Sequence, residues 1–229
     1  MAMHSSSELM EVADVLREQM AQLGQPELET SALHFYDEEP GHIISWRAFR
    51  LGTKTKGKIT KGRMAIPNDS CALVKEWLDL FHSGSPEYTV EVSGAKQKEW
   101  YKVLFRLAPE VGEAMVKRKT TTEPRFYHFS TFSGGALLMV AISLPSEESV
   151  YLQRRAAAVF DLAYRRFRDL KKAEAQAKEA LIEASLEKVR ARALAMQKPA
   201  ELIEVAKLLR SEMGQLGVEE LETSSIYIV

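Results

Sequence analysis

The feature that most constrains this chain is an internal repeat. The segment Glu8–Ser31 aligns without gaps on Glu201–Ser224, and more than half of the aligned positions are identical. Two unrelated amphipathic helices could share a spacing of Leu and Glu. They would not also share the Gln-Leu-Gly and Glu-Leu-Glu-Thr-Ser sequences that follow in both copies. Self-similarity of this kind is typical of duplicated modules, so the sequence predicts one module followed by the beginning of a second.

Each copy of the repeat predicts a helix, a glycine stop and a strand. Apolar residues recur three and four positions apart before Gly24 and before Gly217, and glycine readily takes the left-handed conformation that ends many helices. A strand is predicted from Ala32–Tyr36 in the first copy, whereas the second copy reaches Val229 as its strand begins. Because a single strand beginning cannot close a sheet, we expect the second helix to dock on another surface or to extend the preceding helix. A neighbouring chain's equivalent helix is the partner we expect.

Five further strands and three helices are predicted between the two copies. Alternation of apolar and polar residues predicts strands at Ile43–Phe49, Ile59–Ile66, Tyr88–Val92, Arg125–Phe132 and Ala136–Leu144. Turns are predicted at Glu38–Gly41 and at Ser133–Gly135. Helices are predicted at Cys71–His82, with Asp69 or Ser70 as the N-cap, at Ala95–Arg106 and at Pro109–Lys117.

A long helix is predicted from Glu147, because no Pro or Gly follows before Pro199. Its stripes of Leu and Ala, with opposite charges one turn apart such as Glu174 and Lys178, are typical of a coiled-coil-type helix pair. The residues expected at this homodimer seam are Phe167, Leu170, Ala177, Leu181, Ala184, Leu186 and Val189. A solvated single helix is the alternative, and both parallel and antiparallel pairing remain open.

The predicted order of elements over residues 7–168 resembles that of GAF-like sensory domains. The segment Arg165–Lys198 looks like the connector between such domains in large bacterial sensor histidine kinases and related signalling proteins. The resemblance implies an α+β fold, with a GAF-like central antiparallel sheet flanked by helices and a long C-terminal coiled-coil-type helix. The implied organisation is a sensory domain at 1–168, a connecting signalling helix at 169–198 and a truncated second copy at 199–229.

The chain departs from two well-known GAF subfamilies. It contains no aspartate-rich motif of the cyclic-nucleotide-binding members, and Cys71, its only cysteine, is not in a chromophore-attachment context. We therefore expect neither ligand and no cofactor. A single cysteine also excludes an intramolecular disulfide and fits a reducing compartment.

Composition argues against nucleic acid and membrane partners. The 31 basic and 32 acidic residues leave a net charge of -1, which provides no overall field to attract polyanions. No apolar run approaches the ~20 residues needed to span a bilayer. We therefore expect a cytoplasmic segment with no membrane contact.

Catalytic motifs are incomplete. The segment Gly52–Lys58 begins like a phosphate-binding loop, but Ile59 replaces the Ser or Thr that would hold magnesium, and a strand pattern follows instead of a helix. The five His residues share no metal-ligand spacing, and the long helix contains no phospho-acceptor histidine. We therefore expect neither enzymatic activity nor a metal site.

The remaining candidate site is a pocket between the sheet and its covering helices. Strand alternation places His34 and Tyr36 opposite Leu33 and Phe35, and Arg47 opposite Trp46. The candidate ligand-binding residues are His34, Tyr36, Arg47, Trp100 and His128, for which the alternative is ordinary packing in the core. The function expected is a non-catalytic sensing or relay module that binds an unknown small ligand or partner and transmits through a dimeric helix. The alternative is a ligand-free dimerisation scaffold.

Overall fold

The computed structural model describes Val15, Glu18, Gln19 and residues 28–51, 58–117 and 123–217. The chain divides between Phe167 and Arg168 into two compact units. Most of the helix predicted in the first repeat copy lies outside the described residues. So do the partial phosphate-loop motif at 52–57 and the end of the second copy after Gly217.

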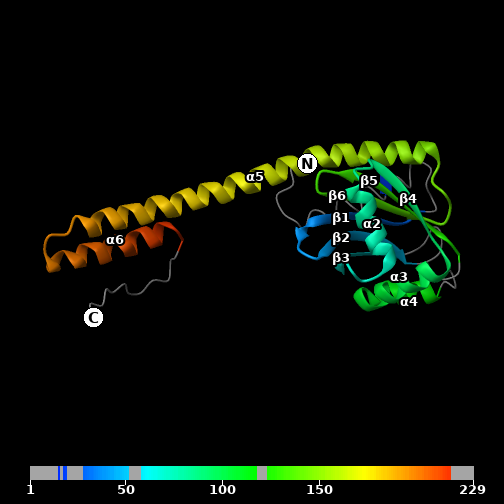
Figure 1. Cartoon of the computed structure of the whole chain (residues 1–229), viewed down its shortest axis with the longest axis horizontal. Coiled ribbons are helices and arrows are strands. Elements are labelled where there is room, and N and C mark those ends of the chain that lie inside the picture. Colours follow the sequence, from blue (N-terminus) through cyan, green and yellow to red (C-terminus); the bar gives the residue numbers. More distant parts are fainter. Residues whose placement is uncertain (1–14, 16–17, 20–27, 52–57, 118–122, 218–229) are drawn as a thin grey trace. The chain divides into compact units, whose positions relative to one another are not determined.

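The first unit is built on a six-stranded sheet in which neighbouring strands pair antiparallel, in the order β3-β2-β1-β6-β5-β4 (Figure 1). The predicted α+β class is therefore confirmed. The strands are β1 (Leu28–Glu39), β2 (His42–Leu51), β3 (Lys58–Pro67), β4 (Glu87–Val92), β5 (Arg125–Phe132) and β6 (Gly135–Ala141). The last strand ends three residues before the predicted Leu144.

Side-chain alternation along the strands gives the sheet two buried faces. In β1, Leu33 and Phe35 point into one core cluster, and Ala32 and Tyr36 point into the other. Gly135, at the start of β6, lies so close to the backbone carbonyl of His34 that a Cβ atom there would collide with it. Glycine at this position therefore permits the pairing of β1 with β6.

Helices α2 (Ala72–His82), α3 (Gly94–Leu107) and α4 (Pro109–Lys117) cover one face of the sheet, called here the α3 face (Figure 1). The N-cap of α2 is Cys71, not Asp69 or Ser70 as predicted, and it makes no side-chain capping bond. The Ser70 amide instead donates to the Pro67 carbonyl in the turn after β3. Burial of the Cys71 side chain in the core therefore places the helix start one residue later.

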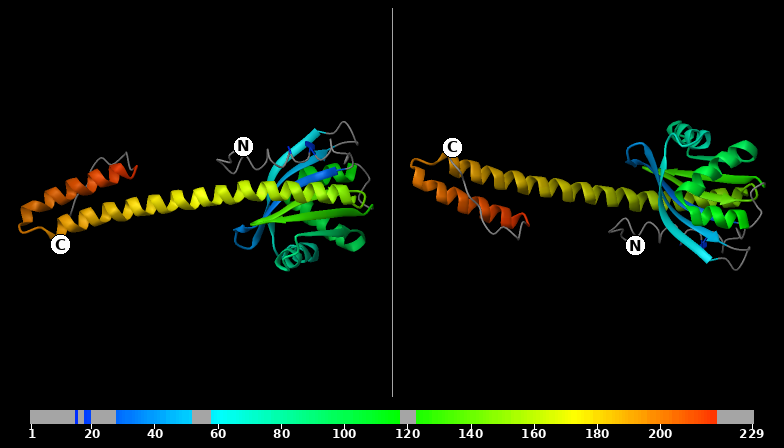
Figure 2. Two further views of the ribbon diagram at one scale, coloured as in Figure 1. Left: turned by 90° about the horizontal axis from the view of Figure 1, so that it is seen from above. Right: turned by 90° about the horizontal axis from the view of Figure 1, so that it is seen from below.

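The first turns of helix α5 (Glu147–Leu194) cover the opposite face, called here the α5 face (Figure 2). Ala157, Phe160 and Tyr164 are buried there against strand residues that include Phe35 and Phe132. Rings of this cluster contact one another in edge-to-face, tilted and stacked arrangements, with centroid separations from 4.9 to 6.4 Å. This face of the sheet is therefore filled largely by aromatic packing.

The second unit contains the remainder of α5, a 3-10 turn at Pro199–Glu201 and helix α6 (Leu202–Gln215). Helix α5 ends at Leu194, before the predicted connector boundary at residue 198. Proline cannot continue a helix, and it disfavours helical backbone in the residue before it. Lys198, the residue before Pro199, is accordingly extended.

Helix α6 folds back on α5 and does not extend it. The Lys188 ammonium lies 2.9 Å from the Glu212 carboxylate, and Val205 and Ser185 are buried. The second-copy helix therefore has a partner within its own chain, where we expected a neighbouring one. Gly217 follows α6 with a φ of 88°, the left-handed conformation that the sequence predicted for the glycine stop.

Candidate functional site

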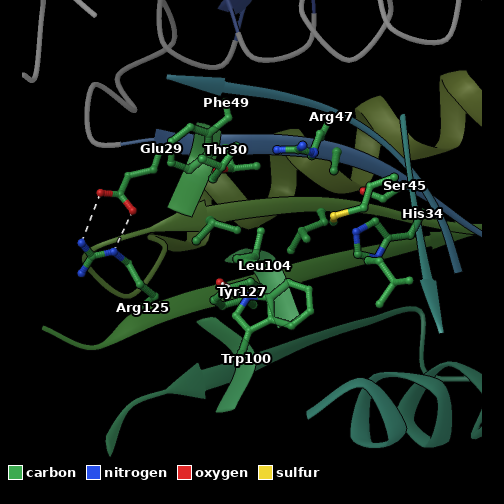
Figure 3. A pocket seen from close by; sticks show the side chains of 16 residues that line it. Glu29, Thr30, His34, Ser45, Arg47, Phe49, Trp100, Leu104, Arg125 and Tyr127 are labelled. Atoms are coloured by element: carbon green, nitrogen blue, oxygen red, sulfur yellow. Dashed lines mark hydrogen bonds and ion pairs between the residues drawn. The ribbon is translucent and has the colours of Figure 1, made fainter. Parts of the chain in front are cut away.

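A small cavity lies on the α3 face, between the sheet and helices α3 and α4 (Figure 3). Its volume is about 40 Å³. Because about 10–15 Å³ is enough for one water molecule in this kind of measure, the cavity has room for a few waters or for a compact ligand. Most of its wall is apolar, from residues that include Phe49, Met64, Leu104, Val111 and Val140.

Trp100 and Tyr127 form an aromatic part of the wall. The Trp100 indole Nε1–H donates to the Tyr127 hydroxyl at 2.9 Å, and both side chains are buried. Burial raises the pKa of Tyr127, so its hydroxyl stays protonated. The polar tips of the two rings thus satisfy each other, and their faces offer apolar contact to whatever enters the cavity.

Three polar side chains of the cavity carry a buried atom with no hydrogen-bond partner. These atoms are His34 Nδ1, Ser45 Oγ and Arg47 Nε. All three side chains are at least nine-tenths buried. Buried polar groups are nearly always hydrogen-bonded, so three such atoms around one cavity indicate a place for water or a polar ligand.

Arg47 is one of two cationic side chains that line the cavity. Alternation along β2 points it to the α3 face, opposite to its neighbour Trp46. Its Nη2 donates to Glu110 Oε1 at 3.2 Å, and the Glu110 side chain is half exposed. Burial lowers the pKa of Arg47 while Glu110 opposes this, and a guanidinium keeps its charge at neutral pH in either case.

His34 is buried beside aromatic side chains and also lines the cavity. Its ring centroid lies 5.7 Å from that of Trp77 and 5.9 Å from that of Phe129. Burial lowers the pKa of His34 from 6.5 to about 3, because the charged imidazolium is poorly solvated there. At neutral pH His34 is therefore an uncharged group that can donate or accept one hydrogen bond at Nδ1, according to its tautomer.

The opposite end of the cavity is closed by an ion pair between Arg125 and Glu29 (Figure 3). Arg125 Nε and Nη2 donate to the two carboxylate oxygens at 2.7 and 3.3 Å, and Nη1 donates to the carbonyls of Glu123 and Pro124. The Arg125 side chain is only 1% exposed. Because its guanidinium group is hydrogen-bonded within the protein, Arg125 closes this end of the cavity and is not expected to bind a ligand.

Of the five predicted ligand residues, His34, Arg47 and Trp100 line the cavity. Tyr36 lies on the same face but is not among the lining residues, and its ring is 4.2 Å from that of Phe81. His128 lies on the α5 side of β5, where its Nδ1 is 2.7 Å from Thr89 Oγ1 and its carbonyl accepts from Gln153. The sequence did not indicate Ser45, Glu29 or Arg125 as cavity residues.

The predicted dimer residues differ in their surroundings. Phe167 is half-buried against the aromatic cluster of the α5 face. Leu170 and Leu181 are each 50% exposed, and Leu186 is 46% exposed. Ala177 and Ala184 are exposed, and Val189 is half-buried.

Comparisons of the chain with protein-family models, with curated proteins and with solved structures find no match. Across the ranges that the structure describes, no three His, Cys, Asp or Glu side chains are grouped to hold a metal ion. None of the helices described is both long and apolar enough to cross a membrane.

Proposed function

We propose that this chain is a non-catalytic sensing or relay module of a bacterial signalling protein. In this proposal a GAF-like sensory domain at 1–168 binds a small molecule, and the connecting helix transmits the change within a cytoplasmic homodimer. The observation that carries the proposal is the cavity of the α3 face with its three unpaired buried polar atoms. A ligand-free scaffold would gain stability from a filled core at the same place.

Helix α5 is the element best suited to carry a change away from the sheet. Its first turns pack Ala157, Phe160 and Tyr164 on the α5 face, and the same helix continues past Phe167 into the second unit. A ligand that favours one packing of the sheet would bias the position of this helix. The exposed Leu170, Leu181 and Leu186 support pairing of the helix with a second chain.

Ligand binding is tested by a thermal-shift screen of nucleotides and metabolites on the full chain. A compound that binds the folded state raises the unfolding midpoint by mass action. Val111→Phe, which fills the cavity from α4, should abolish that rise, whereas Val159→Phe on the exposed side of α5 should leave it unchanged. A broad screen without a single midpoint rise would contradict the sensing function and favour the scaffold.

Pairing through the helix is tested by sedimentation at several concentrations. We expect a dimer for the native chain and a monomer for Leu181→Glu, because a charge at an apolar seam is poorly solvated. Lys172→Glu, an exposed position on the same helix, changes charge without removing an apolar group and should remain dimeric. A native chain that stays monomeric at all concentrations would contradict transmission by a helix pair.

A further inference from the structure

Each of the two cationic side chains at the cavity has a carboxylate partner, but the two differ in how many hydrogen bonds they make. The two guanidinium groups belong to Arg47 and Arg125, and their carboxylate partners are Glu110 and Glu29. Arg125 is held by two carboxylate oxygens and two backbone carbonyls. Arg47 is joined to Glu110 by a single 3.2 Å bond, and its Nε–H points to no acceptor. Arg47 is therefore the cation with capacity for another anion.

We infer that the cavity binds a compact monocarboxylate, whose carboxylate group replaces that of Glu110 at Arg47. The apolar remainder of the ligand would lie against Trp100 and Leu104, which line the same cavity. This inference rests on the proposed function, because it takes the cavity to be the ligand site. It adds the chemical class of the ligand and the residue that the ligand displaces.

The charge balance selects a monoanion. Exchanging one carboxylate for another at Arg47 keeps a single negative partner for this guanidinium, so its charge stays balanced. A dianion such as phosphate would bring a second negative charge, while Arg125 is already committed to Glu29. A neutral amide would leave Arg47 without a counter-charge if it displaced Glu110.

Ser45 and His34 can complete the hydrogen bonding of such a ligand. Both line the cavity with Arg47, and both have an unpaired polar atom. A carboxylate accepts several hydrogen bonds, which a serine hydroxyl and the Nδ1–H tautomer of a neutral imidazole can donate. The volume of about 40 Å³ restricts the rest of the ligand to a short chain.

Glu110 acts in this account as an internal competitor. It lies in the first turn of α4, and its bond to Arg47 joins that helix to β2. Because its side chain is half exposed, the released carboxylate can be solvated by water. Ligand binding would therefore break the ion pair between α4 and the sheet, which gives the sensing module a defined structural response.

The test is a titration of the full chain with acetate, propionate and butyrate, and with acetamide, propionamide and butyramide, followed at the indole N–H signal of Trp100. We expect the carboxylates to shift this signal and the amides to bind at least about tenfold more weakly. Glu110→Gln removes the competitor and should tighten carboxylate binding about tenfold. Glu113→Gln, an exposed position on the same helix, should leave the affinity unchanged.

The outcomes separate the ligand class from the proposed function. Equal binding of amides and carboxylates would overturn the monocarboxylate class and leave a ligand cavity in place. The monocarboxylate class would also be overturned if neither series shifts the Trp100 signal while the metabolite screen finds another ligand for the cavity. Carboxylate binding that Glu110→Gln fails to tighten would overturn the displacement of Glu110. If neither series nor the screen gives binding, the proposed function fails as well.

Discussion

The two faces of the sheet differ in what surrounds their buried polar groups, because the described cavity lies on the α3 face. On the α5 face the amide of Gln153 donates to the carbonyls of His128 and Leu137 at 3.0 and 2.9 Å, beside a cluster of packed rings. On the α3 face Ser45 and Arg47 keep unpaired atoms next to a cavity. Trp46, His128 and Ser130 on the α5 face also have unpaired atoms, but none of them lines the cavity. The same strands thus provide a well-packed attachment for α5 on one side and a place for a ligand on the other.

The largest effect is expected from opening the α5 face. Phe160→Ala removes a buried ring that contacts Phe35, Phe132 and Tyr164, and it should lower the free energy of unfolding by about 3–5 kcal/mol. Urea denaturation measures this change. Val159→Ala, next in sequence and 69% exposed, should change it by less than about 0.5 kcal/mol. A loss below about 1 kcal/mol for Phe160→Ala would show that this face is not tightly packed.

The next largest effect is expected on the pH dependence of the free energy of unfolding, through His34 on the α3 face. The pKa of His34 is 6.5 in the unfolded chain and about 3 in the folded chain. The unfolded state therefore binds a proton first as the pH falls, and the stability present above pH 6.5 is lost progressively toward pH 3. His34→Gln cannot titrate and should flatten part of this decline, as measured by urea denaturation at several pH values.

The control for this pH dependence is the exposed His82, where substitution by Gln should leave the decline unchanged. Burial also lowers the pKa of His128, on the α5 side, so some decline should persist in His34→Gln. An unaltered decline in that variant would show that His34 is more open to water than its surroundings indicate.

The smallest effect on the free energy of unfolding is expected from replacing two buried serines, one on each side of the sheet. Ser45→Ala removes an unpaired hydroxyl from the cavity and should raise the free energy of unfolding by up to about 1 kcal/mol. Ser149→Ala, on α5, removes a hydroxyl that lies 2.7 Å from Ser146 Oγ and should lower it by about 0.5–1.5 kcal/mol. Thermal unfolding of both variants measures the difference. Equal losses in the two variants would contradict the contrast between the faces.

Alternation was enough to predict which residues of one strand share a face. His34 and Arg47 were assigned to the face opposite Leu33 and Trp46, and the structure confirms this because side chains of a strand alternate with a period of two. The cavity itself could not be predicted in this way. Tyr36 shares a face with His34 but lies under Phe81 of α2, and only the packing of the helices separates the two.

The charged partners of the cavity could not be predicted from the sequence either. Arg47 and Glu110 are 63 residues apart, and Arg125 and Glu29 are 96 residues apart. Neither pair belongs to one helix or one hairpin, so no local spacing indicates it. The packing of α6 on α5 was missed for a related reason, since an amphipathic helix shows that it needs a partner without showing which one.

The most direct test of the account compares the indole signals of Trp100 and Trp46 when a compound that raises the unfolding midpoint is added. Trp100 lines the cavity of the α3 face, and Trp46 is buried in the cluster of the α5 face. If the cavity is the ligand site, the Trp100 signal should show the larger shift, and the shift should disappear in Val111→Phe. Binding that shifts Trp46 and leaves Trp100 unchanged would contradict the central claim.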